Sequence, residues 1–112
     1  MARPDSLGQF EQLVLTAILI LLEDAYGVTI HSKAQELARP KAVSLGAVYV
    51  TLDRLEDKGL VASWMSDPTP ERGGRAKRYF QITAKGVKEV RDAQRMLTNM
   101  WRNLSVLQGE IA

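Results

Sequence analysis

The sequence contains no cysteine and a single histidine, His31. The absence of cysteine excludes disulfide frameworks, thiolate nucleophiles and zinc sites with cysteine ligands. His31 has no second histidine with which to share a metal or relay a proton, so we interpret it as a structural or solvated residue. No nucleophile, base and orienting group can be assembled from the remaining residues. We therefore expect no catalytic residue, no metal site, no cofactor and no enzymatic activity.

Long apolar segments are also missing. The longest run, residues 13–22, is ten residues with Thr16 inside it, about half of what a helix needs to cross a bilayer. Residues 1–5 lack the character of a signal peptide. We expect no membrane partner and a reducing, cytoplasmic location. With 112 residues, the chain has room for one compact domain.

The positive charge is clustered, although the net charge is only +2. Four basic residues fall within a short segment that follows Glu71, and these are Arg72, Arg75, Lys77 and Arg78. Such a cluster is typical of a nucleic-acid contact. A solvated run of charge is the alternative.

The first predicted helix covers residues 7–25, starting from a capping box of Ser6 and Gln9 and ending at Tyr26-Gly27. Its apolar residues cover nearly every face, and Leu15 and Leu19 lie away from the main stripe. In so small a protein, a helix of this kind is expected to face its own core on one side and a second subunit on another. The alternative is a central core helix of a monomer.

A short second helix is predicted to stop before Arg39-Pro40. Ser44 then caps a third helix that ends at Lys58-Gly59. One stripe of this third helix is apolar and is predicted to be buried: Leu45, Val48, Leu52 and Leu55. The opposite face is predicted to point outward, and it carries Gly46, Ala47, Val50, Arg54 and Asp57.

Residues 60–65 and 77–83 read as two strands of a hairpin whose tip, residues 67–74, is rich in turn-forming residues. A last helix is predicted from an N-cap at Thr83 to about residue 108. It carries a near-heptad apolar stripe, which comprises Val87, Val90, Leu97, Trp101 and Leu104. Because nothing in the chain is left to cover this stripe, we expect a homodimer.

The fold class is therefore mainly α with a small β-hairpin, arranged as a winged helix-turn-helix followed by a dimerisation helix. We expect residues 1–83 to form the DNA-binding domain and residues 84–112 the dimerisation helix. On the third helix, the candidate DNA contacts are Ser44, Gly46, Ala47, Tyr49, Val50 and Arg54. Ala47 and Val50 can pack on thymine methyl groups in the major groove, and the wing cations can meet phosphates or the minor groove.

Some of these roles have alternatives. Arg54 can reach a guanine or a phosphate, or it can pair with Asp53 or Asp57. Tyr49 can offer its hydroxyl to a phosphate, or it can be purely structural. On the last helix, Met96, Met100 and Trp101 could line a slot between subunits for a planar hydrophobic effector; alternatively, Trp101 simply anchors the dimer core.

Several motifs also resemble a known family. They are Leu7-Gly8-Gln9-Phe10-Glu11, Tyr26-Gly27, Ser44-Leu45-Gly46-Ala47-Val48-Tyr49, Leu52-Asp53-Arg54-Leu55-Glu56, Lys58-Gly59-Leu60-Val61 and the run from Arg75 to Gly86. In this order they resemble the PadR family of bacterial transcriptional regulators, in its short form with one C-terminal helix.

The resemblance implies a winged helix-turn-helix homodimer, usually a repressor, that dimerises through its C-terminal helix and binds a palindromic operator in double-stranded DNA. It makes Tyr49 a DNA-facing residue and residues 73–77 the wing. The family often has proline after that tyrosine, whereas this chain has Val50. Effectors in some members are phenolic acids or hydrophobic drugs. A winged helix that serves only as a protein-interaction module, without DNA binding, is the alternative function.

Overall fold

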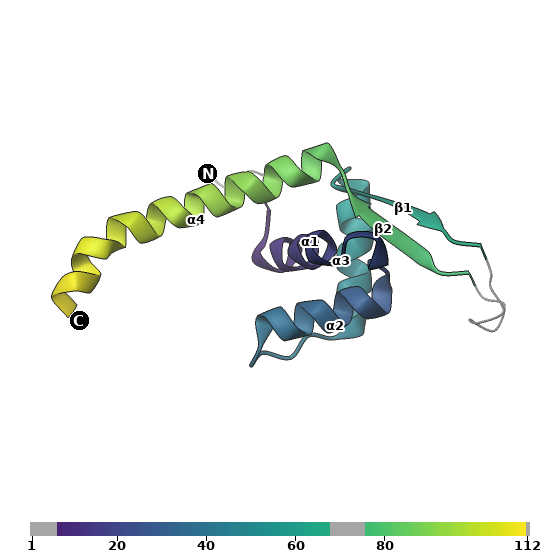
Figure 1. Ribbon diagram of the computed structural model, residues 1–112, viewed down its shortest axis with the longest axis horizontal. Helices are drawn as coiled ribbons and strands as arrows, with labels where there is room; N and C mark the ends of the chain where they lie inside the picture. The colour runs from purple at the N-terminus through teal and green to yellow at the C-terminus, as the bar shows by residue number, and fades with distance from the viewer. Residues whose placement is uncertain (1–6, 68–75, 112) are drawn as a thin grey trace.

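The computed structural model describes residues 7–67 and 76–111, with side chains described as far as Leu104 in the last helix. The elements follow the order α1 (Gln9–Leu21), η1 (Leu22–Asp24), α2 (Gly27–Ala38), α3 (Leu45–Asp57), β1 (Val61–Met65), β2 (Arg78–Ile82) and α4 (Ala84–Ile111). Helices α1, α2 and α3 form a compact body beside the two-stranded hairpin, and α4 extends away from it (Figure 1). This is the mainly helical fold with a small hairpin that the sequence predicts.

Helix α1 is shorter than predicted. It begins after Gly8, whose backbone N–H donates to the Glu11 carboxylate over 2.9 Å, and the predicted cap Ser6 lies outside the described residues. The helix ends at Leu21 because Leu22 takes a positive φ of 56°, and a 3-10 turn follows. The predicted extension to residue 25 is therefore wrong, and Tyr26-Gly27 marks the start of α2, whose first residue is Gly27.

Helices α2 and α3 meet through a turn that His31 helps to hold. The Nε2 atom of His31 lies 2.6 Å from the backbone oxygen of Val43. Because a carbonyl oxygen only accepts, this nitrogen carries the proton. His31 thus has a structural contact, as the sequence analysis expected.

The hairpin pairs its strands antiparallel, from Val61 opposite Ile82 to Met65 opposite Arg78. It is joined to the segment between η1 and α2 by a hydrogen bond from the Phe80 N–H to the Ala25 oxygen (2.9 Å) and by an isolated bridge between Tyr26 and Tyr79. The tip, residues 68–75, lies outside the described residues.

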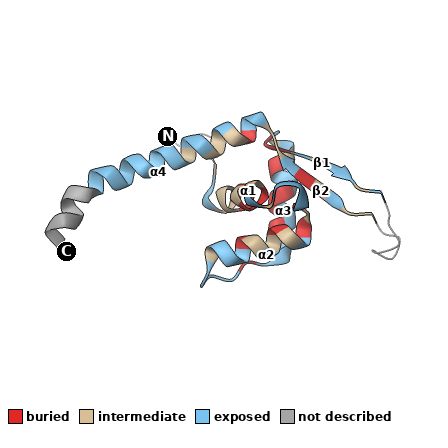
Figure 2. Cartoon of the chain, in the orientation of Figure 1, coloured by how far each residue is buried: buried red, intermediate tan, exposed pale blue. Residues whose placement is uncertain are grey.

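Helix α4 is anchored at its start. The Thr83 hydroxyl accepts from the Gly86 N–H (3.1 Å), as the predicted N-cap requires, and donates to the Gly59 oxygen (2.7 Å). Beyond this anchor, Val90 packs against the core cluster. The outer part of the helix is exposed along its described length (Figure 2).

The core lies where α1, α2, α3 and β2 converge (Figure 2). Its largest fully buried side chains include Leu15, Ile18, Ile30, Leu52 and Phe80. Leu15 has no exposed surface at all within the single chain. Its predicted place at a dimer interface is therefore wrong: the whole of its side chain is used by the chain's own core.

Candidate nucleic-acid interface

The N-terminus of α3 is capped as predicted. The Ser44 hydroxyl oxygen accepts a hydrogen bond from the Ala47 N–H over 3.1 Å. This satisfies one of the backbone donors that a helix leaves free in its first turn. Ser44 itself is exposed, so the cap lies at the surface together with the residues that follow it.

One face of α3 is buried and the other is open. The buried residues are Val48, Thr51, Leu52 and Leu55, whereas Leu45 at the first position is exposed. The predicted stripe is therefore confirmed at Val48, Leu52 and Leu55 and wrong at Leu45, and the polar Thr51 also belongs to it. The predicted outward residues Gly46, Ala47, Val50 and Arg54 are all exposed. Apart from the backbone of α3 itself and the neighbours of Gly46 in the chain, no described atom lies within 4 Å of the position that a Cβ at Gly46 would take, so a large partner can approach this turn closely.

Arg54 makes no ion pair with Asp53 or Asp57 within the described part of the chain. Its charge does contribute to lowering the pKa of Glu11. Asp53 is engaged elsewhere, as described below. Of the two interpretations of Arg54, pairing with its helical neighbours is therefore wrong, and its guanidinium is available to an acidic partner.

Tyr49 has both an exposed side and a packed one. Its ring and hydroxyl lie against Gly27 at the start of α2 so closely that any Cβ at that position would overlap them. The side chain is nevertheless about half exposed. Tyr49 is thus held in place by the backbone of α2 beside the outward face of α3, which is compatible with either predicted role.

The base of the wing is fastened to α3 through Arg78. Its guanidinium forms an ion pair with Glu56 and lies 3.4 Å from the Asp53 carboxylate, and its Nε donates to the Ser63 hydroxyl over 3.1 Å. The Ser63 hydroxyl in turn donates to Glu56 over 2.8 Å. We call the set of Asp53, Glu56, Ser63 and Arg78 the wing clasp.

The wing clasp corrects the expectation that Arg78 is a free phosphate contact. Its charge is already shared by two carboxylates of α3, so a phosphate has to compete with them. Sequence reasoning missed this because the contact depends on the hairpin folding back over α3. Alternation along the strands supplies the only local signal, since Ser63 and Arg78 share the face of the hairpin that looks toward α3.

Of the other three predicted wing cations, only Lys77 lies within the described residues. The Nζ atom of Lys77 lies 4.0 Å from the centroid of the Tyr26 ring, a cation–π distance. Tyr26 meets Tyr79 edge-on, and Tyr79 stacks on Trp64 at a centroid distance of 6.1 Å. Arg72 and Arg75 lie outside the described residues.

Lys58, at the C-terminal end of α3, forms a largely buried ion pair with Glu11 in the first turn of α1. The Lys58 Nζ lies 2.8 and 3.1 Å from the two oxygens of Glu11. Burial raises the pKa of Glu11, but the hydrogen bonds from Lys58 and Gly8 and the charges of Lys58 and Arg54 together outweigh it. The net result is a pKa below the ordinary value of a glutamate. This pair fixes the end of α3 against α1.

Some residues of the predicted dimer face pack within the chain itself, and others are exposed. Val90 packs on the chain's own core, and Leu19 lines a cavity beside the hairpin. Leu97, Trp101 and Leu104 are each about half exposed. Met96 and Met100 line a cavity of about 370 Å³ between α4 and the start of α1, but Trp101 does not. The three residues predicted to share an effector slot are therefore not all brought together within one chain.

Among the residues that the structure describes, no three acidic or histidine side chains are grouped as they would need to be to hold a metal ion. Within the same residues, no helix is both long and apolar enough to cross a membrane.

The sequence matches a known protein family. Residues 15–92 match the model of the transcriptional regulator PadR-like family. The chain belongs to this family. Its members are transcriptional regulators that generally bind DNA, and they are not enzymes. No curated protein matches the sequence.

Solved structures agree with this PadR-like fold. A PadR family regulator from Clostridium difficile superposes with a TM-score of 0.71 at 20% identity, covering 90% of this chain and 99% of its own. A PadR-like regulator from Bacillus cereus gives 0.65 at 24% identity, with 84% and 88% covered. BpsR of Bordetella bronchiseptica, whose DNA binding is regulated by 6-hydroxynicotinic acid, gives 0.64 at 16% identity, with 91% and 67% covered. At these identities the likeness shows the fold alone.

Proposed function

We propose that this PadR-like protein is a dimeric, sequence-specific repressor that places α3 of each subunit in the major groove of a palindromic operator. The observation that carries the proposal is the division of α3 into a buried stripe and an exposed face of small and apolar residues followed by Arg54. Small residues at the start of a recognition helix permit close approach, and methyl-bearing side chains can discriminate thymine.

The same proposal assigns DNA binding and dimerisation to different segments of the chain. Residues 1–83 form the DNA-binding part and residues 84–112 the dimerisation helix, which pairs through Leu97, Trp101 and Leu104. Leu19 also contacts the partner in this proposal, whereas Val90 packs α4 against the core of its own subunit. Two linked subunits bind two half-sites with an effective concentration that a monomer lacks.

The wing supplies affinity more than sequence choice in this proposal. Arg72, Arg75 and Lys77 are the cations assigned to the phosphate backbone, and Arg78 holds the wing on α3. A small hydrophobic or aromatic effector that releases the operator completes the proposal, with Met96, Met100 and Trp101 as its contacts. The regulation of DNA binding of BpsR by 6-hydroxynicotinic acid supports the idea that small molecules act on this fold.

The test begins by selecting bound DNA from a random pool and then measuring mobility shifts on the selected operator. Val50→Glu is expected to abolish operator binding, because it puts a carboxylate toward an acidic groove. The side chain of Val50 is 59% exposed, so the substitution should leave the fold intact, as circular dichroism can check.

Two variants control this measurement. Val50→Thr keeps the branched shape without charge and should bind nearly as the parent does, whereas Gln35→Glu adds the same charge at an exposed position of α2. Normal operator binding by a folded Val50→Glu protein would refute the docking of α3. Failure to recover any DNA, with no salt-dependent shift, would favour the alternative of a protein-interaction module.

A further inference from the structure

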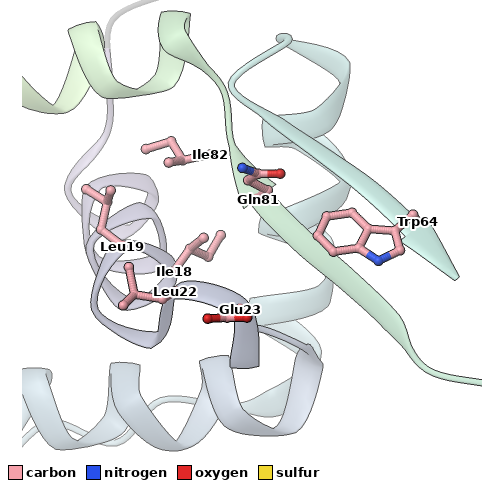
Figure 3. A pocket seen from close by; sticks show the side chains of 7 residues that line it. All are labelled: Ile18, Leu19, Leu22, Glu23, Trp64, Gln81 and Ile82. Atoms are coloured by element: carbon pink, nitrogen blue, oxygen red, sulfur yellow. The ribbon is translucent and has the colours of Figure 1, made fainter. Parts of the chain in front are cut away.

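A cavity of about 430 Å³ lies between the end of α1 and the hairpin. One wall comes from α1 and η1 and the other from the hairpin (Figure 3). Its lining residues are Ile18, Leu19, Leu22, Glu23, Trp64, Gln81 and Ile82. The volume falls within the range of roughly 300–1,000 Å³ that small-molecule sites occupy.

Apart from Leu19, which the proposed function also assigns to the dimer contact, this cavity shares no residue with the recognition face, the wing clasp or the apolar face of α4. Trp64 and Gln81 are on the face of the hairpin opposite to Ser63 and Arg78, because successive strand residues alternate between faces. Trp64 and Gln81 therefore face away from the wing clasp, and only Ile82, at the end of β2, lines the cavity from the face that carries Arg78. No residue of α4 is among the described residues that line it.

Both walls of the cavity are held in place by contacts already present. The Phe80 N–H donates to the Ala25 oxygen over 2.9 Å, which ties β2 to the segment directly after η1. Trp64 is held by stacking on Tyr79, its partner on the neighbouring strand, and Tyr79 is bridged to Tyr26. Because the fold already orders both walls, a ligand that binds in the cavity loses little free energy to the ordering of side chains and backbone.

The lining has an apolar majority and few polar groups. The Trp64 side chain is 46% exposed, which leaves part of the indole open for a planar guest. Glu23 is the one charged residue of the lining, and it has no ion-pair or hydrogen-bond partner in the described structure. The Gln81 amide adds a neutral donor and acceptor.

Leu22 adds an independent observation at the rim. Its φ of 56° is the one positive value at a non-glycine residue among those described, and its side chain is 71% exposed. This backbone conformation is sterically strained for a leucine, whose side chain forms no local hydrogen bond to offset the strain. Residues held in such conformations gather at ligand sites. Here the strain ends α1 at the edge of the cavity and places both Leu22 and Glu23 in the lining.

We propose that this cavity is a binding site for a planar aromatic cation. The ring system stacks on the indole of Trp64 and covers Leu19, Leu22 and Ile82, while the cationic group pairs with the free carboxylate of Glu23. An indole face and a carboxylate both favour positive charge, the first through its ring quadrupole and the second through its net charge. An anionic ligand meets repulsion from Glu23, and no cation among the described lining residues compensates for it.

The proposal can be tested on the full-length protein without DNA, so its outcome is independent of operator binding. Three probes share one tricyclic ring and differ in charge: proflavine, a cation near neutral pH; acridine, which is largely neutral at slightly alkaline pH; and acridine carboxylate, an anion. Isothermal titration calorimetry should rank their affinities in that order.

Matched variants then locate the site. Glu23→Gln should weaken proflavine binding about two- to five-fold, as expected for loss of one solvent-accessible charge pair. It should leave acridine binding unchanged. Asp24→Asn removes the neighbouring acid, which does not line the cavity. Trp64→Leu should weaken proflavine binding about tenfold, because stacking and the cation–π contact are lost together, and should weaken acridine binding less, because only stacking is lost.

Several outcomes would overturn the assignment. Equal losses in Glu23→Gln and Asp24→Asn would mean that proflavine is attracted by surface charge alone. Loss of binding in Trp101→Leu with full binding in Trp64→Leu would place the ligand on α4. If none of the three probes binds, or if the anion binds as tightly as the cation, the cavity does not select planar cations.

Discussion

Replacement of Lys58 by methionine should expose how strongly the end of α3 is held to the start of α1. Methionine keeps an unbranched apolar stem and removes the ammonium group. The side chain of Glu11 is only 7% exposed and that of Lys58 is 25% exposed. In the variant, the Glu11 carboxylate keeps the Gly8 N–H and the charge of Arg54, but it loses its direct counter-ion.

The magnitude follows from this geometry. Removing one partner of a buried ion pair typically costs about 3–5 kcal/mol. Because a quarter of the Lys58 side chain is open to water, solvent can partly replace it, and we expect a loss of about 2–3 kcal/mol near neutral pH. Lys33 provides the matched control: its side chain is also 25% exposed, but its partner Glu36 is 57% exposed. Lys33→Met should cost no more than about 0.5 kcal/mol.

The loss should also depend on pH. In the parent protein the pKa of Glu11 is lowered, so the carboxylate stabilises the fold above the unfolded-state pKa of about 4.3, and this stabilisation disappears as the pH falls through the folded-state pKa. In Lys58→Met the main lowering contribution is gone while burial still raises the pKa. Protonation of Glu11 then removes the unpaired buried charge from the variant. The difference in unfolding free energy between the parent and the variant should therefore shrink as the pH falls toward and below about 4.3.

Urea unfolding followed by circular dichroism at neutral and acidic pH measures both effects. Glu11→Gln introduced into the Lys58→Met protein should restore part of the lost stability, because a neutral amide costs less to bury than an unpaired carboxylate. The reasoning fails if Lys58→Met and Lys33→Met cost the same, or if the deficit of Lys58→Met is independent of pH.

Three shorter predictions concern the other contacts. Gly86→Ala should cost about 1–3 kcal/mol, because the added Cβ would overlap the Leu60 backbone oxygen, whereas Gly46→Ala, with open space around it, should cost nothing or stabilise slightly in urea unfolding. Arg78→Gln should raise hydrogen-exchange rates across β1 and β2 and weaken operator binding, whereas Lys88→Gln, which breaks the exposed pair with Asp92, should change neither; unaltered exchange would mean that the wing clasp does not hold the hairpin. Leu97→Glu should convert a dimer into a monomer by light scattering, with Thr98→Glu as the control for added charge; a dimer that survives Leu97→Glu, or a parent protein that is already monomeric, would contradict the assignment of α4.

The features predicted correctly from the sequence are those whose signals are local. The Ser44 cap, the stripe of α3 and the Thr83 cap each depend on residues within one or two helical turns, so periodicity and capping chemistry suffice to find them. The hairpin was predicted to within one or two residues for the same reason.

The features missed depend on contacts that are distant in the sequence. Apolar residues continue through Leu22, so nothing in the pattern announces that α1 stops at Leu21. Gly27 resembles a helix stop, but it starts α2 at a point where the Tyr49 ring leaves no room for a Cβ. Arg78 resembles the other wing cations until the hairpin register brings it to Glu56. Single-sequence periodicity does not contain this information.

The exposed length of α4 connects assembly to helix stability. Its first turns are held by Thr83 and the core, but its described residues beyond position 93 are all exposed, so they gain little from tertiary packing within the subunit. Isolated helical segments of this size are marginal in water. Leu97, Trp101 and Leu104 follow at intervals of four and three residues and therefore lie on one face, and monomeric proteins rarely leave such an apolar stripe open. Burial of this face by a second α4 would supply the missing stabilisation, so formation of the outer part of the helix and pairing of the subunits should be coupled events. Dissociation of the proposed dimer is then expected to loosen α4 first and to leave the wing and α3, which have their own core, folded.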